Sequence, residues 1–346
     1  MKYRFILEPY KGLSTRHICP QCGYNKSFSR YVDLMNEIQF PSYVGRCDRE
    51  NSCSYHFKAK DYFLQSSELM NINKIPVPGK VTTKQIEALQ PSYIDLQLAN
   101  QSFTNYSNNN LFQFLASKFG HSKTMLLMEQ YLTGTHSKWP GACVFWQIDF
   151  NMNIRSGKVL LYNLKNGRRI KQPYNHISWV HTLCKFENFN LKQCFFGEHL
   201  LAKDSIRPVA IVESEKTALI CSSTFPQFIW LSTGGKNGSF QKDSLEVLRN
   251  RKVILVPDLG ATEYWNKKSE MMKELGIQVV VFDYLEKLAT TKQREEGFDI
   301  ADFILDTLPI KLDENHSGNQ KNSFELISVA LDLIYETQIK KENAIN

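Results

Sequence analysis

Short apolar runs alternate with amphipathic segments over the last 140 or so residues of the chain. The apolar runs fall at 208–212, 227–231, 252–256 and 278–282, and segments with helical spacing fall near 215–223, 240–250 and 262–275. Strand–helix–strand alternation is typical of a parallel sheet with helices on its faces. We therefore predict an α/β domain with a mostly parallel sheet and helices on both faces over residues 206–346, closed by an amphipathic helix near 323–338.

The middle of the chain has a different pattern. Residues 111–132 space apolar side chains at three and four, which predicts one or two helices broken near Gly120. Residues 142–149 and 158–164 have the composition of strands, with a turn predicted at 151–157. These features predict a mixed α+β middle domain over 111–205. The polar segment 63–110, rich in Pro and Asn, is predicted to be a linker with a short helix near 83–90.

The first 62 residues contain a cysteine cluster. The ligand candidates are Cys19, Cys22, Cys47 and Cys53. The first two form a CxxC turn followed by Gly23, and the second two are separated by five residues. Zinc takes four sulfur or nitrogen ligands in a tetrahedron, so we predict a zinc-ribbon domain over 1–62 with a structural Zn²⁺. His17 or His56 could replace one ligand; a redox CxxC pair and unrelated cysteines are the alternatives.

Carboxylates follow the predicted parallel strands. Glu213 comes directly after the first strand, Asp258 follows the third, and Asp299 and Asp302 follow the fourth. Ligands of open parallel sheets bind beyond the carboxyl ends of the strands, where these side chains would meet. Oxygen ligands of this kind suit Mg²⁺ or Mn²⁺. Glu215 and Lys216, which follow Glu213, could form a solvated first turn of a helix, where Glu215 would only offset the helix dipole.

Basic and glycine-rich segments supply candidate phosphate contacts. The loop "STGGKNGS" at 232–239 contains Lys236 and precedes a predicted helix, whose N-terminus could meet a phosphate. The basic candidates of the middle domain are Lys158, Lys165, Arg168, Arg169 and Lys171. An exposed hairpin turn without function is the alternative for the "KNGRRIK" segment.

Charge and hydropathy narrow the class of protein. The net charge is +7, with basic residues in excess over the first 210 residues and acidic residues in excess over the rest. This asymmetry favours a polyanionic partner for the N-terminal part. No apolar run approaches the ~20 residues of a membrane span, and the N-terminus lacks a signal-peptide pattern. We expect a cytoplasmic protein with no membrane partner.

The order of strand–Glu, Gly-rich turn, strand–Asp and a later Asp pair resembles the toprim domain of DnaG-type primases, topoisomerases and related nucleases. With the upstream ribbon, the layout resembles bacterial and phage primases. It is most similar to toprim-containing proteins of bacterial mobile elements, through "CPxCG…GRCDRE…C", "FWQID" and "FGEHLL…VAIVESEKTA". The resemblance covers roughly residues 15–60 and 140–305.

The resemblance implies roles for individual residues. Glu213 matches the toprim glutamate, a general acid/base or metal-organising group, and Asp258 matches the first Asp of the DxD motif. Gly260 stands at the position of the second Asp, a departure for which Glu263, or Asp299 and Asp302, could compensate. The cysteine pattern of the ribbon also departs from that of such primases, because they often use a CxxH and a CxxC pair.

Three functional hypotheses follow. The first is a primase-like protein that carries out metal-dependent nucleotidyl transfer on single-stranded DNA, with nucleotides as substrates and a separate replicative helicase as a candidate partner, in the replication of a mobile element. The second is a non-catalytic toprim module that binds nucleic acid, which Gly260 favours. The third is a toprim nuclease that uses the same acids.

Overall fold

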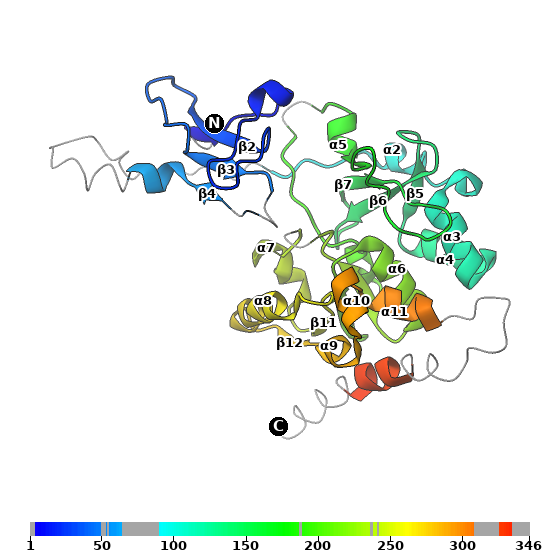
Figure 1. Cartoon of the computed structure of the whole chain (residues 1–346). Coiled ribbons are helices and arrows are strands. Elements are labelled where there is room, and N and C mark those ends of the chain that lie inside the picture. The colour runs from blue at the N-terminus through cyan, green and yellow to red at the C-terminus, as the bar shows by residue number, and fades with distance from the viewer. Residues whose placement is uncertain are drawn as a thin grey trace. The chain divides into compact units, whose positions relative to one another are not determined.

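The chain forms two compact units, Met1–Ile86 and Glu87–Asn346. Its structure is a computed structural model that describes residues 4–49, 53, 55–63, 90–186, 189–235, 238–240, 242–307 and 325–333. Figure 1 labels most of the helices and strands of both units. Lys236, residues 83–89 of the predicted short helix and the ends of the predicted closing helix lie outside the described residues, whereas residues 325–333 are helical.

The first unit is built around a four-stranded antiparallel sheet. Its strands, in spatial order, are β1 (Phe5–Leu7), β2 (Phe28–Asp33), β3 (Gly45–Cys47) and β4 (His56–Phe57). One buried cluster lies beside the cysteines and consists of Cys19, Phe28 and Cys47, with Cys53 and Tyr55 packed against it. A core this small gives little hydrophobic stabilisation, so a bound metal would contribute much of the stability of this unit.

The second unit begins with helices and an antiparallel meander. Its helices include α2 (Leu96–Asn100), α3 (Asn110–Phe119) and α4 (His121–Gln130), and its strands follow in the order β5 (Thr133–His136), β6 (Ala142–Ile148), β7 (Ile154–Leu160) and β8 (Ile177–Trp179). The predicted helix break is confirmed: Gly120 has φ 86° and separates α3 from α4. The turn predicted at 151–157 is too long, because β7 already begins at Ile154.

A parallel sheet follows, as the sequence predicts. The strands are β9 (Val209–Val212), β10 (Ile229–Ser232), β11 (Lys252–Leu255) and β12 (Gln278–Val281), in the spatial order β10-β9-β11-β12. The connection from β9 to β10 and that from β11 to β12 run in opposite directions along the sheet. Right-handed crossovers therefore place α6 (Glu215–Thr224) and α8 (Thr262–Glu274) on opposite faces (Figure 1).

The meander and the parallel sheet share one hydrophobic core. Every residue of β6 is buried. Phe145 faces the cluster that contains Ile211 and Trp230, whereas Trp146 faces a second cluster on the other side of the meander. The hydroxyl of Tyr131 donates a hydrogen bond of 2.9 Å to the carbonyl of Trp230. The predicted middle and C-terminal domains are thus joined in one unit.

Part of the predicted linker is folded. Ile94 and Ala99 are buried in the second cluster, and Asn109 caps α3 by accepting a hydrogen bond from the backbone N–H of Phe112. Residues 90–110 therefore belong to the second unit rather than to a linker. In the part of the chain that is described, no helix has the length and apolar character needed to cross a membrane.

Candidate functional site

Four cysteines come together in the first unit. They are Cys19, Cys22, Cys47 and Cys53, and their sulfur atoms all lie within 4.8 Å of one another. The Sγ atoms of Cys19 and Cys53 are 3.7 Å apart, and those of Cys22 and Cys47 are 4.0 Å apart. A tetrahedral Zn²⁺ with Zn–S bonds of about 2.3 Å requires sulfur–sulfur distances of about 3.8 Å. The cluster therefore has the dimensions of a zinc site.

Local backbone structure places these ligands. Gly23 has φ 67° and donates its N–H to the carbonyl of Cys19, which closes the first knuckle. The two alternative ligands lie elsewhere: His17 contacts Glu8 through Nε2 at 3.1 Å, and His56 contacts the hydroxyl of Tyr31 at 3.1 Å. The four-cysteine set is the one that the structure supports.

The four predicted acidic residues line one pocket of the second unit. They are Glu213, Asp258, Asp299 and Asp302. The pocket has a volume of about 550 Å³ and lies between the meander and the carboxyl ends of the parallel strands. Glu213 follows β9 directly, and Asp258 lies just beyond the neighbouring β11. We call this the carboxylate pocket.

The last two acids also cap a helix. Asp299 precedes α11 (Ile300–Thr307) and its Oδ1 accepts a hydrogen bond of 2.9 Å from the backbone N–H of Asp302. Oδ2 of Asp302 accepts one of 3.2 Å from the N–H of Asp299. Thr217 donates a hydrogen bond to the other carboxylate oxygen of Asp299. This reciprocal capping fixes both carboxylates and occupies part of their acceptor capacity.

Burial, together with repulsion between neighbouring carboxylates, raises the pKa of two of these acids. Burial, followed by the charges of Asp299, Glu213 and Asp302, raises the pKa of Asp258 to about 9. Burial and the charge of Asp299 raise the pKa of Asp302 to about 6, against the opposing effect of Lys216. A nearby cation would offset the repulsion between these carboxylates and would favour their ionised forms.

Basic side chains line the same pocket. Arg168, Arg169, Lys171 and Lys216 contribute to its wall. Arg168 lies 3.3 Å from the carboxylate of Glu296, and the ammonium of Lys216 donates to the carbonyl of Gly167 at 3.3 Å. Lys216, which the sequence pattern treats only as part of a solvated helical turn, is a basic residue of the pocket wall. Lys165 is exposed and is not among the pocket-lining residues.

Lys158 has a partner that the sequence pattern did not predict. Its ammonium donates to Oε1 and Oε2 of Glu215 at 2.9 and 3.2 Å and to the carbonyl of Gly234 at 2.7 Å. The side chains of Lys158 and Glu215 are only 6% and 3% exposed. The interpretation of Glu215 as a solvated helical turn is therefore wrong, because this buried pair joins β7 to the start of α6.

The glycine-rich loop contributes backbone to the pocket wall. Gly234 and Gly235 line the pocket with φ angles of 75° and 132°. These values belong to the left-handed region that glycine favours, so the loop can bring its backbone close to the carboxylates without a side chain in between. The predicted phosphate contact Lys236 lies outside the described residues.

Gly260, which stands where the toprim resemblance has a second Asp, lies outside the carboxylate pocket. Gly260 has φ 79° and donates its N–H to Oε1 of Glu286 at 2.7 Å, and it does not line the pocket. Glu263, one of the proposed substitutes, forms an exposed pair with Lys267 at 2.9 Å. Of the two suggested compensations, only Asp299 and Asp302 reach the pocket.

The two candidate metal centres differ in their geometry. Among the described residues, the cysteines are the one group of three or more His, Cys, Asp or Glu whose ligand atoms lie within 4.8 Å of one another. The carboxylates of the pocket are more widely spaced. A divalent cation with several water ligands would suit such spacing, because Mg²⁺ usually keeps part of its hydration shell.

Two stretches of the chain match family models. Residues 3–68 match a zinc beta-ribbon finger family, and residues 109–259 match a domain of unknown function, DUF6371. The first match and the four-cysteine cluster together identify the N-terminal unit as a zinc ribbon. Among the curated proteins, none matches the chain.

Several solved structures of primases are similar to the chain. The primase fragment of the bacteriophage T7 primase-helicase protein shares 14% identity with a TM-score of 0.32, over 82% of this chain and 98% of that one. The RNA polymerase domain of Mycobacterium tuberculosis primase DnaG shares 15% identity with a TM-score of 0.34, over 61% and 68%. A DnaG primase catalytic domain bound to single-stranded DNA shares 11% identity with a TM-score of 0.38, over 63% and 81%.

Proposed function

We propose that the chain is a primase-like nucleic-acid-binding protein that carries out metal-dependent nucleotidyl transfer on single-stranded DNA. The observation that carries this proposal is the carboxylate pocket, where four acids from three segments meet basic side chains at the carboxyl ends of parallel strands. Phosphoryl transfer depends on positioning and on charge stabilisation more than on covalent participation of the protein, and this combination of side chains suits both.

The acids would hold Mg²⁺ or Mn²⁺, which neutralises charge on transferring phosphates and lowers the pKa of an attacking hydroxyl. Carboxylate oxygens fit these hard cations. Burial and then the neighbouring carboxylates raise the pKa of Asp258, and a bound cation would offset the repulsion from those carboxylates. Arg168, Arg169 and Lys171 are exposed on the pocket wall and would bind phosphates of the template strand or of nucleotides.

Each predicted domain has a part in this proposal. The ribbon at 1–62 would hold the single-stranded template, as Tyr24 is 57% exposed and the guanidinium of Arg49 lies 4.3 Å from its ring centre. The middle domain at 111–205 would bind phosphates, and the domain at 206–346 would act as a toprim-type catalytic domain. Replication of a mobile element, with a separate helicase, is the setting we propose.

A non-catalytic toprim module that binds nucleic acid is the second candidate. Two observations favour it: Gly260 leaves the DxD motif without its second acid, and the pocket carboxylates are not within 4.8 Å of one another as a group. In that case the basic wall would still bind a strand, but nucleotides would not be joined.

A denaturing gel separates these functions. The zinc-loaded protein is incubated with single-stranded DNA, labelled NTPs and dNTPs, and Mg²⁺ or Mn²⁺, beside Glu213→Gln and the matched control Asp283→Asn. Asp283 is exposed, pairs with Lys287 at 3.3 Å and lies outside the pocket. New short products that disappear only in Glu213→Gln are expected. Shortened template would instead indicate a nuclease, and retention of DNA on a native gel without either product would indicate the non-catalytic module.

A further inference from the structure

The loop after β11, which carries Asp258, is held by two segments from later in the chain. Leu259 donates its N–H to the carbonyl of Phe298 at 3.0 Å. Gly260 donates its N–H to Oε1 of Glu286 at 2.7 Å. Loops at the ends of strands are usually mobile unless they are tied down, and these two bonds come directly after Asp258. They therefore determine where the backbone of this acid lies.

The side chain of Glu286 is itself oriented by its neighbours. It belongs to α9 (Tyr284–Leu288), which follows β12 (Figure 1). Its Oε1 also accepts a hydrogen bond of 3.2 Å from the hydroxyl of Thr262. Arg294 of α10 (Thr291–Glu296) pairs with the other carboxylate oxygen and also donates to the backbone carbonyl of the same glutamate. These charge-assisted bonds direct Oε1 toward the loop after β11.

The same region of the chain leads on to Asp299. A capping box fixes the start of α10, and Phe298 donates its N–H to the carbonyl of Gln293 in that helix at 3.1 Å. Phe298 accepts the N–H of Leu259 and immediately precedes Asp299. We call residues 284–298 the brace, because they connect the loop that carries one pocket acid to the start of the segment that carries another.

The contacts of Glu286 suit positioning better than stabilisation of the whole domain. Neither Glu286 nor Arg294 is among the residues that line the carboxylate pocket. Their side chains are 27% and 44% exposed, and exposed ion pairs contribute little to global stability. The effect of this pair on the pocket is therefore exerted through the loop that it holds.

We propose that Glu286 is a positioning residue for the metal site: it fixes the loop after β11 so that Asp258 and Asp299 face the same divalent cation. This inference rests on the metal-dependent function proposed above. Groups that orient ligating carboxylates from outside the ligand set commonly change metal affinity tenfold or more when they are removed. Gly260 has a place in this arrangement, because its backbone N–H is the donor to Glu286.

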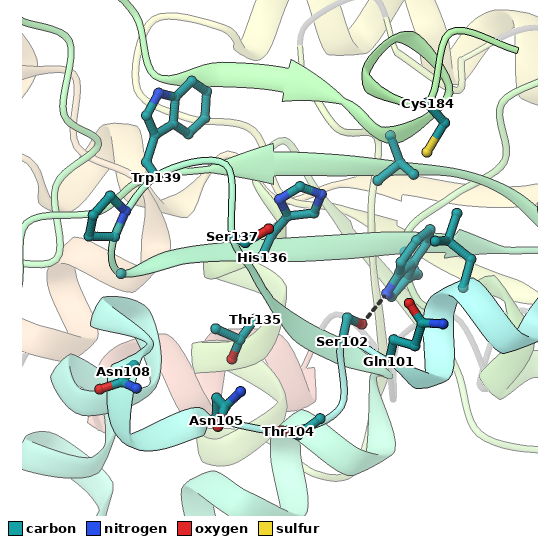
Figure 2. Close-up of a pocket in the computed structure, with 15 residues that line it drawn as sticks. Gln101, Ser102, Thr104, Asn105, Asn108, Thr135, His136, Ser137, Trp139 and Cys184 are labelled. Atoms are coloured by element: carbon teal, nitrogen blue, oxygen red, sulfur yellow. Dashed lines mark hydrogen bonds between the residues drawn. The ribbon is translucent and has the colours of Figure 1, made fainter.

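Hydrogen exchange followed by mass spectrometry tests the first half of the proposal without a catalytic metal. The zinc-loaded full chain is compared with Glu286→Ala, and exchange in the segment 258–262 should become about tenfold faster in the variant. The segment 101–108 is the internal reference. It contributes to a separate cavity of about 450 Å³ beside β5, which shares no lining residue with the carboxylate pocket (Figure 2). Its exchange should not change.

Two further variants separate positioning from a general loss of structure. Glu286→Gln keeps an oxygen that can accept the N–H of Gly260, so it should restore most of the protection of the loop. Glu246→Ala is the matched control, because Glu246 forms an exposed pair with Arg249 and does not line the pocket. It should exchange like the wild type in the segment 258–262. The thermal midpoint of Glu286→Ala should fall no further than that of Glu246→Ala.

A titration with Mn²⁺ tests the second half. Glu286→Ala should bind Mn²⁺ at least about tenfold more weakly than the wild type, whereas Glu286→Gln should stay within about threefold. If Glu286 acts through Asp258, the two substitutions are not additive: in an Asp258→Asn background, Glu286→Ala should cause no further loss of affinity. Glu246→Ala should bind like the wild type.

Unchanged exchange in the segment 258–262 of Glu286→Ala overturns the proposal. Faster exchange with wild-type Mn²⁺ affinity also overturns it, as does a loss of affinity that is fully retained in the Asp258→Asn background. These outcomes differ from failure of the proposed function, in which Glu213→Gln binds Mn²⁺ as tightly as the wild type. That result would overturn the metal site itself, and the positioning role with it.

Discussion

At the scale of single residues, the raised pKa values of Asp258 and Asp302 predict that their ionised forms destabilise the fold. Asp258 is partly buried near three other carboxyl groups, and these neighbours contribute to the rise of its pKa to about 9. Groups with strongly shifted pKa values in a cleft are typical of functional sites, where stability is commonly lower than the fold could reach. A measurement of how much Asp258 lowers the stability of the fold therefore also tests whether the pocket is a functional site.

Asp258→Asn should stabilise the protein in the absence of Mg²⁺. The pKa of about 9 lies above the ordinary value of 3.8, so the folded chain holds a proton that the unfolded chain releases, and stability falls as the pH rises from about 4 to about 9. The variant removes this loss, so its free energy of unfolding should be higher by about 0.5–2 kcal/mol at pH 8 and by less at pH 5. Urea unfolding, followed by tryptophan fluorescence, measures this difference. Asp283→Asn, as the exposed control, should show no such gain; an equal gain in both variants would contradict the explanation.

For the buried pair of Lys158 and Glu215 we predict that substitution of one partner lowers the stability of the protein. Lys158→Met leaves the carboxylate of Glu215 buried without its cation, which should cost about 3–5 kcal/mol. The double variant Lys158→Met/Glu215→Leu should recover most of that loss, since no buried charge remains. A double-mutant cycle in urea measures the coupling. Independent, additive losses would show that the pair is not coupled.

At the scale of elements, the parallel strands and the acids after them were predictable, but the partners of polar residues were not. Runs such as Val209–Val212 are apolar on both faces, which defines a buried strand, and the first polar residue after each run marks the edge of the sheet. By contrast, β7 contains Arg155, Ser156 and Lys158, and the local pattern treats the first two as part of a turn and begins the strand only at Lys158. Arg155 pairs with Asp149 at the other end of the same hairpin turn, whereas Ser156 contacts His181 and Lys158 pairs with Glu215, both on other elements.

The loop after β11 allows a test of the missing acid. If Gly260 were simply a lost ligand position, Gly260→Asp should restore tighter Mn²⁺ binding. We expect no increase in affinity, because Gly260 does not line the pocket, and a loss of about 1–2 kcal/mol in stability, because its φ of 79° disfavours a side chain.

Gly276→Asp is the matched control for this variant, since Gly276 has φ 75° and open space around it. Both variants should lose similar stability in urea unfolding, and both should bind Mn²⁺ like the wild type in a titration. Tighter Mn²⁺ binding by Gly260→Asp alone would show that the DxD position still faces the metal.

At the scale of the whole molecule, the chain consists of two units with separate hydrophobic clusters. The five tryptophans all lie between residues 139 and 265, so their fluorescence reports on the second unit alone. The zinc cluster lies in the first unit. The two folding reactions can therefore be followed separately.

Removal of zinc by a chelator should unfold the first unit and leave the second intact. Small zinc ribbons depend on their metal because folding and metal binding are one reaction. Limited proteolysis should then cleave within the first 60 residues, while the tryptophan emission and its thermal midpoint stay unchanged. A matching loss of the tryptophan signal on chelation would contradict the independence of the two units.

The most direct test of the central claim is a titration of Mn²⁺ into the zinc-loaded full chain, followed by electron paramagnetic resonance of the free ion. If the carboxylate pocket is a metal-dependent site, the wild type and Asp283→Asn should bind Mn²⁺ with the same affinity. Glu213→Gln should bind at least about tenfold more weakly, because it removes a charged oxygen ligand. Equal Mn²⁺ affinity in the wild type and Glu213→Gln would contradict the claim that these acids form the metal centre.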